Sequence, residues 1–553
     1  MSTTIYPAKS IITFNGYRPR AQAVAVRDGR ILCVGSLQEC QAWGEAVVDD
    51  RFADKILMPG MIEAHGHTAQ ATVKFFPYVG FYDTPMPDGS TAPGVKSYDE
   101  LLDVLRAVDA KLPEGETLIA NGFDPIFFDG QPRLDAAMLD QVSTTRPIFV
   151  RHASGHLATV NTALIESEKI ADDTTTPGIM RDAAGKPNGE LQEAPAMALA
   201  KNAFQMLLAL NGNPDVVFDY GRLCRNAGVT TTTELVGPFL LLPESVKIFA
   251  DIVNREDFPA RISVYNLPGI PGSTADYAGA AAKALELQAL TTDKLRLGGI
   301  KLVGDGSLQG WTACCGAPGY YTGEDHGLAQ FTQEDLDLAV QTFHDAGLQI
   351  YLHANGDATV DQFIIAVDRA LRKTAWLDHR HTAQHSQTTT AHQYRAMARL
   401  GIAVNIFTNH IWYWGDQHYS TVMGPERVER MWACRTAKDL GISVTYHSDS
   451  GVTPTSQLHT AWCAVNRVTP SGRILGEAEK VDVETALRAV TIEAAYQLHM
   501  DHEVGSIEAG KLADFAVLES DPLEVEPIEL RNVKVWGTVV GGVIYEAEKP
   551  AAS

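Results

Sequence analysis

The chain is short of positive charge. Lys and Arg total 45 against 68 Asp and Glu, which gives a formal net charge of -23 at pH 7. Such an excess of negative charge repels phosphate backbones and anionic lipids, so we expect neither nucleic acid nor a membrane as partner. No window approaches the ~20 apolar residues that cross a bilayer, and the amino terminus has no apolar stretch behind a basic start. These features predict a cytoplasmic protein.

Cysteine is also scarce. The seven cysteines are odd in number, scattered and never spaced as CxxC, which argues against a disulfide framework and against a thiolate zinc site. No internal repeat or low-complexity tract is present either. With 45% hydrophobic and 20% charged residues, the composition is that of a folded protein with a buried core.

Both ends of the chain have the pattern of short antiparallel strands. Near the amino terminus, SIITFNG and AQAVAVRDGRILCVG alternate apolar and polar residues and turn at Asp28-Gly29. Near the carboxyl terminus, KLADFAVLES and VKVWGTVVGG follow a turn signal at Glu508-Ala509-Gly510. We predict one small β-sandwich domain built from residues 1–57 and 503–553.

The middle of the chain, residues 58–502, alternates apolar strands with amphipathic helices such as QEDLDLAVQTFHDAG and PERVERMWACRTAKDLG. This rhythm predicts an α/β fold, a TIM-like (β/α)8 barrel. Residues 68–222 break the rhythm, with PIFVRH as a strand and APAMALAKNAFQMLLAL as a helix, and we interpret them as a large insertion after barrel strand 1 that covers the barrel mouth. The expected strands are Ile56–Ala64, Val229–Leu235, Arg261–Leu267, Gly299–Val303, Gln349–His353, Thr382–His385, Ile402–Phe407 and Ile442–His447.

Polar residues with metal-binding chemistry lie at the ends of these strands. His65 and His67 are two residues apart, so in extended backbone both imidazoles face one way; alone, they could equally be polar residues of a loop. Taken singly, the later residues also have ordinary explanations: an ion pair of Lys301 with Asp305, core histidines, or a helix cap. For the site to be ordinary, every one of these separate explanations would have to be true at once, and all of the residues lie at the strand ends where barrel enzymes build their sites. We therefore favour a metal centre. Its later candidates are Lys301, His353, His385 and Asp449.

At this point the sequence resembles the amidohydrolase superfamily, and within it the YtcJ-like metal-dependent amide hydrolases of amidohydrolase family 3. The resemblance covers nearly the whole chain and rests on PGMIEAHGH, IKLVGDGSLQGWTA, YLHANGD, AQHSQ, HSDSGVTP and GSIEAGKLADFAVLESDPL, in this order. SGHLATVNTALI and GELQEAPAM are similar to segments of the YtcJ-like insertion. The sequence departs from the pattern of this family at two places. His447-Ser448 stands before Asp449 where the family usually has Gly-Ser, and Asn355 stands where the family often has an apolar residue.

The resemblance implies metal ligands residue by residue. His65 and His67 match the first-strand ligands, His353 and His385 those of the fifth and sixth strands, and Asp449 the eighth-strand aspartate. Lys301 matches a lysine that many relatives carboxylate to bridge two metals, whereas in other branches one metal binds or an acid such as Glu193 takes that place. Relatives are often dimers, so the resemblance also implies a homodimer.

The chemistry agrees with this resemblance. A divalent ion, with Zn2+ favoured and other divalent metals open, lowers the pKa of bound water and polarises a carbonyl, while Asp449 shuttles the proton to the leaving nitrogen. We therefore predict a hydrolase of carbon-nitrogen bonds other than peptide bonds, acting on an amide or N-acyl group of a small molecule. The alternatives are an ester or lactone hydrolase and a non-catalytic scaffold.

Substrate contacts are predicted from two regions. His410, Trp412 and Tyr413 follow the seventh strand and could wall a pocket, or form a packed aromatic loop instead. His156 and Asp124 lie in the insertion and would contact substrate if it folds over the barrel mouth, as would Glu193.

Overall fold

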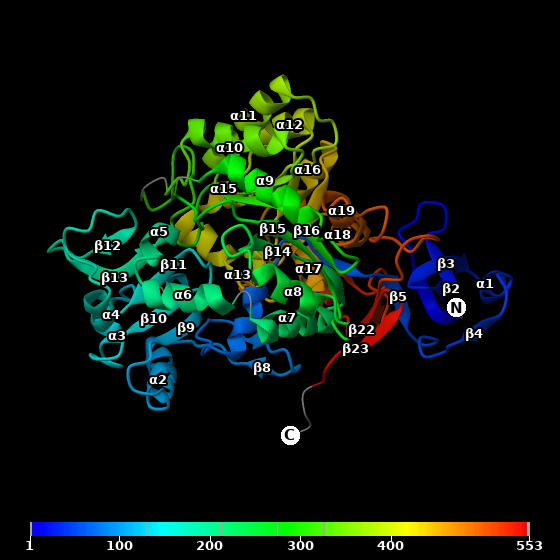
Figure 1. The fold of residues 1–553 in the computed structure, drawn as a ribbon, viewed down its shortest axis with the longest axis horizontal. Coiled ribbons are helices and arrows are strands. Elements are labelled where there is room, and N and C mark those ends of the chain that lie inside the picture. The colour runs from blue at the N-terminus through cyan, green and yellow to red at the C-terminus, as the bar shows by residue number, and fades with distance from the viewer. Residues whose placement is uncertain (1–2, 129, 211–212, 274, 324–326, 550–553) are drawn as a thin grey trace.

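The middle of the chain forms an eight-stranded parallel sheet (Figure 1). The computed structural model describes residues 3–128, 130–210, 213–273, 275–323 and 327–549. Each expected strand segment overlaps one strand of this sheet, whose order is β20-β19-β18-β17-β16-β15-β14-β6. The strands are β6 Met61–Glu63, β14 Val229–Gly237, β15 Arg261–Asn266, β16 Leu295–Val303, β17 Ile350–Ala354, β18 Thr382–His385, β19 Ala403–Ile406 and β20 Val444–Tyr446.

The sheet curls until its two end strands meet. The carboxylate of Glu63, the last residue of β6, accepts a hydrogen bond of 3.1 Å from the backbone N–H of Ser448, just after β20, and one of 2.9 Å from Gln457 Nε2. Parallel strands in such a sheet are covered on both faces, which fits the unbroken β-branched run Thr230–Thr233 in β14, where all four side chains are buried. The arrangement is that of a TIM-like fold.

The first expected strand is in fact two strands. The segment 56–64 divides at Gly60 into β5 (Ile56–Pro59), which belongs to a different sheet, and β6. The backbone N–H of Gly60 donates to the carbonyl of Asp514, and a Cβ at Gly60 would lie 1.9 Å from Thr230 Oγ1. Only glycine fits at this crossing between the two sheets.

Helices lie outside the parallel sheet, and the segment 425–441, expected as one helix, is interrupted. Trp432 there adopts a φ of 49° and donates its indole N–H to Gln387 Oε1. None of the helices in the described residues combines the length and apolar character needed to cross a membrane. The helices are α7 Pro214–Asn226, α8 Ser245–Val253, α9 Tyr277–Gln288, α10 Gln333–Asp345, α11 Asp357–Lys373, α12 Ala391–Leu400, α13 His410–Tyr413, α14 Gly415–Gln417, α15 Pro425–Val428, α16 Cys434–Asp439, α17 Gln457–Asn466, α18 Val483–Ala489 and α19 Ile492–Gln497.

Strands from both ends of the chain form one further sheet, seen at the right of Figure 1 in blue and red. Its order is β23-β22-β21-β5-β1-β2-β3, with β4 paired to β1 and the short helix α1 (Leu37–Gln41) beside it. Apolar residues of both termini, among them Ile11, Val24 and Phe515, pack in one buried cluster. The strands are β1 Thr3–Ile12, β2 Arg20–Arg27, β3 Arg30–Gly35, β4 Ala46–Val48, β5 Ile56–Pro59, β21 Phe515–Leu518, β22 Val535–Val540 and β23 Val543–Glu546.

The segment between β6 and β14 contains a third sheet, at the left of Figure 1 in cyan. Its order is β12-β13-β11-β10-β9, and each of its faces packs in an apolar cluster. The stretch 194–210, expected as one helix, is two, α5 and α6. The elements are β9 Leu118–Phe123, β10 Ile148–His152, β11 Leu157–Val160, β12 Ile179–Arg181, β13 Pro187–Gln192, α2 Tyr98–Asp109, α3 Ala136–Leu139, α4 Thr162–Ser167, α5 Glu193–Met197 and α6 Lys201–Leu210, besides the small hairpin β7 Thr84–Pro85 and β8 Thr91–Ala92.

A buried ion pair joins the parallel sheet to the terminal sheet. Arg261, at the start of β15, donates from Nε to Asp514 Oδ2 at 2.7 Å and from Nη2 to Oδ1 at 3.0 Å. Their side chains are only 5% and 2% exposed. Removing one partner of such a pair leaves a buried charge without compensation.

We expect Asp514→Ala to lower the free energy of unfolding by about 3–5 kcal/mol, because the guanidinium of Arg261 would stay buried and unpaired. Urea unfolding followed by tryptophan fluorescence measures this loss. Asp257→Ala is the matched control, since it breaks the exposed pair with Arg255 and should leave the stability unchanged. Equal effects of the two substitutions would contradict the assignment.

Candidate active site

The six predicted metal-binding side chains meet at the carboxyl edge of the parallel sheet. They come from five different strands of this sheet, which end on the same side because they are parallel. His65 and His67 follow β6, Lys301 lies on β16, His353 on β17, His385 ends β18, and Asp449 follows β20.

The Asp449 carboxylate lies at the centre of the group. Its Oδ1 lies 3.1 Å from His67 Nε2 and 3.7 Å from His65 Nε2, and its Oδ2 lies 3.7 Å from His385 Nδ1. Lys301 Nζ is 3.3 Å from His65 Nε2. The ring of His353 is 4.4 Å from that of His385, centroid to centroid, so all six residues form one cluster.

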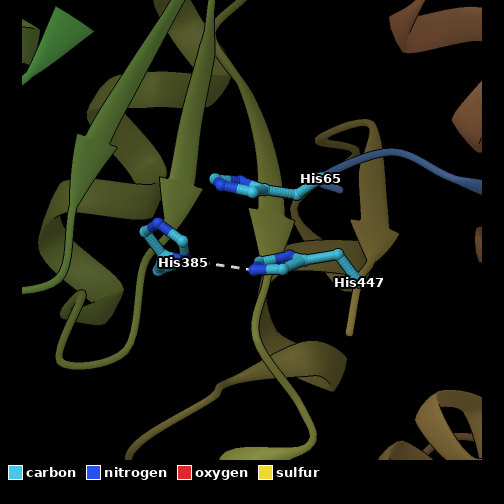
Figure 2. A group of neighbouring side chains, drawn as sticks. All are labelled: His65, His385 and His447. Atoms are coloured by element: carbon cyan, nitrogen blue, oxygen red, sulfur yellow. Dashed lines mark hydrogen bonds between the residues drawn. The ribbon is translucent and has the colours of Figure 1, made fainter. Parts of the chain in front are cut away.

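A further imidazole, absent from the predicted set, belongs to this cluster. Figure 2 shows His447 beside His65 and facing His385. Its ring stacks on that of His65 at 4.8 Å, and its Nε2 lies 3.0 Å from His385 Nδ1. In the sequence, the only indication of a role for His447 was that the His447-Ser448 pair departs from the family pattern.

Burial sets the charge of the imidazoles. It lowers the pKa of His65, His353 and His385 well below the usual value for histidine, so their rings are neutral and have a nitrogen lone pair to offer. His67 differs: burial acts to lower its pKa, but the nearby carboxylates of Asp449 and Glu234 outweigh burial and raise the pKa to about 9. The carboxylates therefore create a field that favours positive charge at this place.

Lys301 is an amine in a dry environment. Burial lowers its pKa to about 7, although the charges of Asp449 and Glu234 act in the opposite direction. Near neutral pH a large fraction of this side chain is therefore the free amine, the form that can bind a metal or react with CO2.

The backbone is strained at three of the predicted site residues. His385, Asp449 and Glu193 have φ values of 71°, 53° and 65°, in the left-handed region that non-glycine residues rarely occupy. Such conformations cost energy and concentrate at functional sites, where they aim a side chain that packing alone would not place.

The donor atoms suit a divalent cation. Two overlapping groups, His65 with His67 and Asp449, and His65 with His385 and His447, have their ligand atoms within 4.8 Å of one another. His385 Nε2 and Asp449 Oδ1 are buried without a hydrogen-bond partner. Because neutral imidazole nitrogens and carboxylate oxygens are ordinary zinc ligands, the residues present fit a metal of this kind.

Supporting residues orient these ligands. Gln384 Oε1, which can only accept, lies 2.6 Å from His65 Nδ1, so Nδ1 carries the proton and Nε2 is left as the ligand atom. Glu234 Oε1 lies 3.4 Å from His67 Nδ1, and Asn355 Nδ2 lies 3.0 Å from His353 Nε2. Neither Gln384 nor Glu234 was among the residues predicted from the sequence, although both stand near the ends of predicted strands.

The segment between β6 and β14 covers this cluster and encloses a cavity of about 220 Å³. His156 and Glu193, both predicted to contact substrate, line it, and His156 Nδ1 lies 2.8 Å from Glu193 Oε2. Burial acts to lower the pKa of His156, but the charge and hydrogen bond of Glu193 outweigh it and the pKa is raised. Other lining residues are His65, His67, Phe149, Arg151, Met197, Phe204, Leu207, Leu208, Lys301, His353 and Asp449.

A model of the amidohydrolase family matches residues 53–545, nearly the whole chain. The chain belongs to the amidohydrolase family. This confirms the resemblance found in the sequence, and it makes the protein an enzyme rather than the non-catalytic scaffold that the sequence left as an alternative.

Curated relatives of this amidohydrolase are similar over almost their full length. N-substituted formamide deformylase of Arthrobacter pascens is 27% identical, with 95% of each chain covered. YtcJ of Bacillus subtilis (strain 168) is 23% identical over 95% of this chain and 96% of its own. LONG AFTER FAR-RED 3 of Arabidopsis thaliana is 25% identical over 96% of this chain and 90% of its own.

A solved structure is similar in fold. The uncharacterised metal-dependent hydrolase of Pyrococcus horikoshii OT3 superimposes with a TM-score of 0.71 and 17% identity, covering 95% of this chain and 99% of its own.

Four of the predicted substrate contacts lie away from the cavity lining of the amidohydrolase. His410 Nδ1 lies 3.0 Å from His418 Nε2, and Trp412 packs edge-on against Trp462. The Tyr413 ring lies against that of Tyr82, while Asp124 accepts a hydrogen bond from Trp414 Nε1. The geometry thus matches the packed aromatic loop, and a substrate role for His410, Trp412, Tyr413 and Asp124 stays a prediction.

We expect the purified amidohydrolase to contain about one or two equivalents of divalent metal, as the cluster of neutral imidazoles and a carboxylate requires. Chelation should lower the melting temperature, and restoring the metal should raise it again, because the ion binds the folded state alone. Elemental analysis by mass spectrometry and differential scanning calorimetry measure both effects.

His65→Ala should remove most of the metal, whereas His392→Ala, which replaces an exposed histidine on α12, should leave the metal content unchanged. Full metal content in His65→Ala would contradict the assigned site.

Proposed function

We propose that the amidohydrolase uses a divalent metal to hydrolyse an amide or N-acyl bond of a small, non-peptide molecule. The ligands would be His65, His67, His353, His385 and Asp449. The observation that carries the proposal is the pair of buried ligand atoms without a hydrogen-bond partner, His385 Nε2 and Asp449 Oδ1, in a cluster of neutral imidazoles.

The proposed metal is Zn2+, bound as one or two ions. Lys301, as a neutral amine 3.3 Å from His65 Nε2, is the residue whose carboxylation would supply a bridging carboxylate for a second ion. Glu193 is the alternative bridging acid, because its Oε1 is also buried without a partner and faces the cavity. Mass spectrometry of the intact protein distinguishes the carboxylated lysine from the free one.

A bound divalent ion supplies the activation of water and the polarisation of the scissile carbonyl. Asp449 lines the cavity, so its carboxylate can take a proton from the attacking water and return that proton to the departing nitrogen. His156, held by Glu193 and facing the cavity, is placed to donate a hydrogen bond to the substrate carbonyl oxygen. Side chains of the covering segment line the same cavity and would shield these groups from bulk water.

The preference for an amide over an ester rests on the relatives. The similarity to N-substituted formamide deformylase, 27% identity over 546 residues, supports a substrate with an N-acyl group. Chemically, the same residues could hydrolyse an ester or lactone, since only the leaving atom differs.

Asp449→Asn should keep the folded structure and much of the bound metal, since the amide oxygen remains, but lower kcat/KM by about 10²–10⁴-fold through loss of the proton shuttle. Steady-state kinetics with parallel metal analysis measures this. Asp251→Asn, which alters an exposed aspartate on α8, is the control and should behave as the unmodified enzyme. Unchanged turnover in Asp449→Asn would remove Asp449 from the mechanism.

A panel of matched substrates tests the reaction itself. Metal-loaded enzyme is assayed with N-formyl and N-acetyl amines and with esters of the same acyl groups, and the released amine, alcohol and acid are separated by chromatography. We expect release of amine from at least one amide. Ester hydrolysis with no amide cleavage would instead make the enzyme an esterase.

A further inference from the structure

One strand of the covering segment presents both an apolar and a cationic side chain to the cavity. Along β10, Ile148 and Val150 point into the apolar cluster under α2. Phe149 and Arg151 lie on the opposite face, two residues apart, and both line the cavity beside His67 and Asp449. Arg151 was not among the residues predicted from the sequence.

In the part of the chain that the structure describes, the guanidinium of Arg151 has no partner. Among the described residues, no carboxylate, carbonyl or hydroxyl oxygen accepts a hydrogen bond from it. Two buried arginines of this chain have acceptors: Arg261 binds Asp514, and Arg467 donates to the backbone carbonyls of Trp432 and Met431. A half-buried guanidinium with five N–H donors and no acceptor is costly, so an anion from outside the protein would be strongly favoured there.

The neighbouring loop leaves room for this side chain. Gly155 has a φ of 75°, and a Cβ at this position would lie 2.7 Å from Arg151 Nη2. Burial lowers the pKa of Arg151, while the charge of Asp449 acts to raise it. An arginine keeps its proton despite such burial, so the group is a permanent cation at the wall of the cavity.

Apolar side chains of α5 and α6 form part of the cavity wall. Met197 of α5 and Phe204, Leu207 and Leu208 of α6 line the same cavity as Arg151. A monoanion is favoured over a dianion, because Asp449 and Glu193 face the cavity and would repel a dianionic phosphate more strongly than a single carboxylate. A planar carboxylate also matches the fork of the guanidinium.

We propose that Arg151 binds a carboxylate of the substrate, and that the substrate is an N-acylated amino acid or a similar amide with an apolar group beside its carboxylate. This inference rests on the proposed amide hydrolysis and specifies its substrate class. Arg151 is then a specificity-determining residue: the barrel edge holds the reacting groups, while β10 selects amides that carry an anion.

Two amides that differ only in the carboxylate test the proposal. N-acetylphenylalanine, supplied as each enantiomer, and N-acetylphenethylamine are assayed with metal-loaded enzyme. We expect kcat/KM to be about 10- to 100-fold higher for one enantiomer of N-acetylphenylalanine than for N-acetylphenethylamine. A charge-assisted hydrogen bond between the guanidinium and the carboxylate provides a gain of this size. Arg151→Met should bring this ratio close to one, and Arg151→Lys should retain part of it. Arg106→Met, an exposed arginine of α2 in the same segment, is the control and should keep the ratio.

Binding without turnover separates this proposal from the hydrolase itself. Calorimetric titration of metal-loaded enzyme with 3-phenylpropionate should give binding that Arg151→Met weakens by about the same factor. Turnover of both amides at equal rates, or a ratio unchanged in Arg151→Met and Arg151→Lys, would overturn the carboxylate site and leave the hydrolase standing. Binding of 3-phenylpropionate that depends on Arg151, with no amide cleaved, would keep the carboxylate site and overturn the proposed hydrolysis.

Discussion

The site depends on one buried carboxylate, that of Glu63. It joins the two end strands of the parallel sheet, accepting hydrogen bonds from the backbone of His65 at 3.0 Å and of Ser448 at 3.1 Å. His65 is itself in the cluster and lies two residues before His67, and Ser448 directly precedes Asp449. The hydrogen bonds of Glu63 therefore position the residues that follow both the first and the last strand of the sheet. Burial raises the pKa of Glu63 to about 7 against the effect of these bonds. Between β6 and β20, which do not pair with each other in the sheet, the contact is therefore made through the side chain of Glu63.

Closure at Glu63 also explains the electrostatics of the cluster. Imidazoles brought together in a dry place lose their protons, and the carboxylates of Asp449 and Glu234 then face few cations. His67 responds by holding a proton with a raised pKa, and Lys301 stays poised near pH 7. A divalent ion would resolve this imbalance better than a proton does, because it satisfies several lone pairs at once. The same burial that costs stability would thus give the cluster an affinity for metal.

The sequence predicts what depends on local pattern. Parallel strands are apolar and β-branched along their whole length, so Val229–Leu235 could be recognised, and the polar residues that end them had to share one edge. What depends on packing between distant segments could not be predicted. Arg151 appears as one basic residue in an apolar strand, and only the placement of β10 over the barrel gives it a role. The opposite holds for Trp412 and Tyr413, which follow a barrel strand but pack in α13 on other aromatic rings and do not line the cavity.

The division between barrel edge and covering segment has a physical consequence for specificity. The sheet of the covering segment has its own apolar clusters, so Phe149 and its neighbours are held in place without help from the predicted metal ligands. A change in β10 or α6 therefore alters the shape and charge of the cavity while the network of Glu63, His65 and Ser448 keeps its geometry. Interaction energies of residues that share no contact add nearly independently. Substrate selection can in this way vary among proteins with this fold while the groups that carry out hydrolysis remain the same.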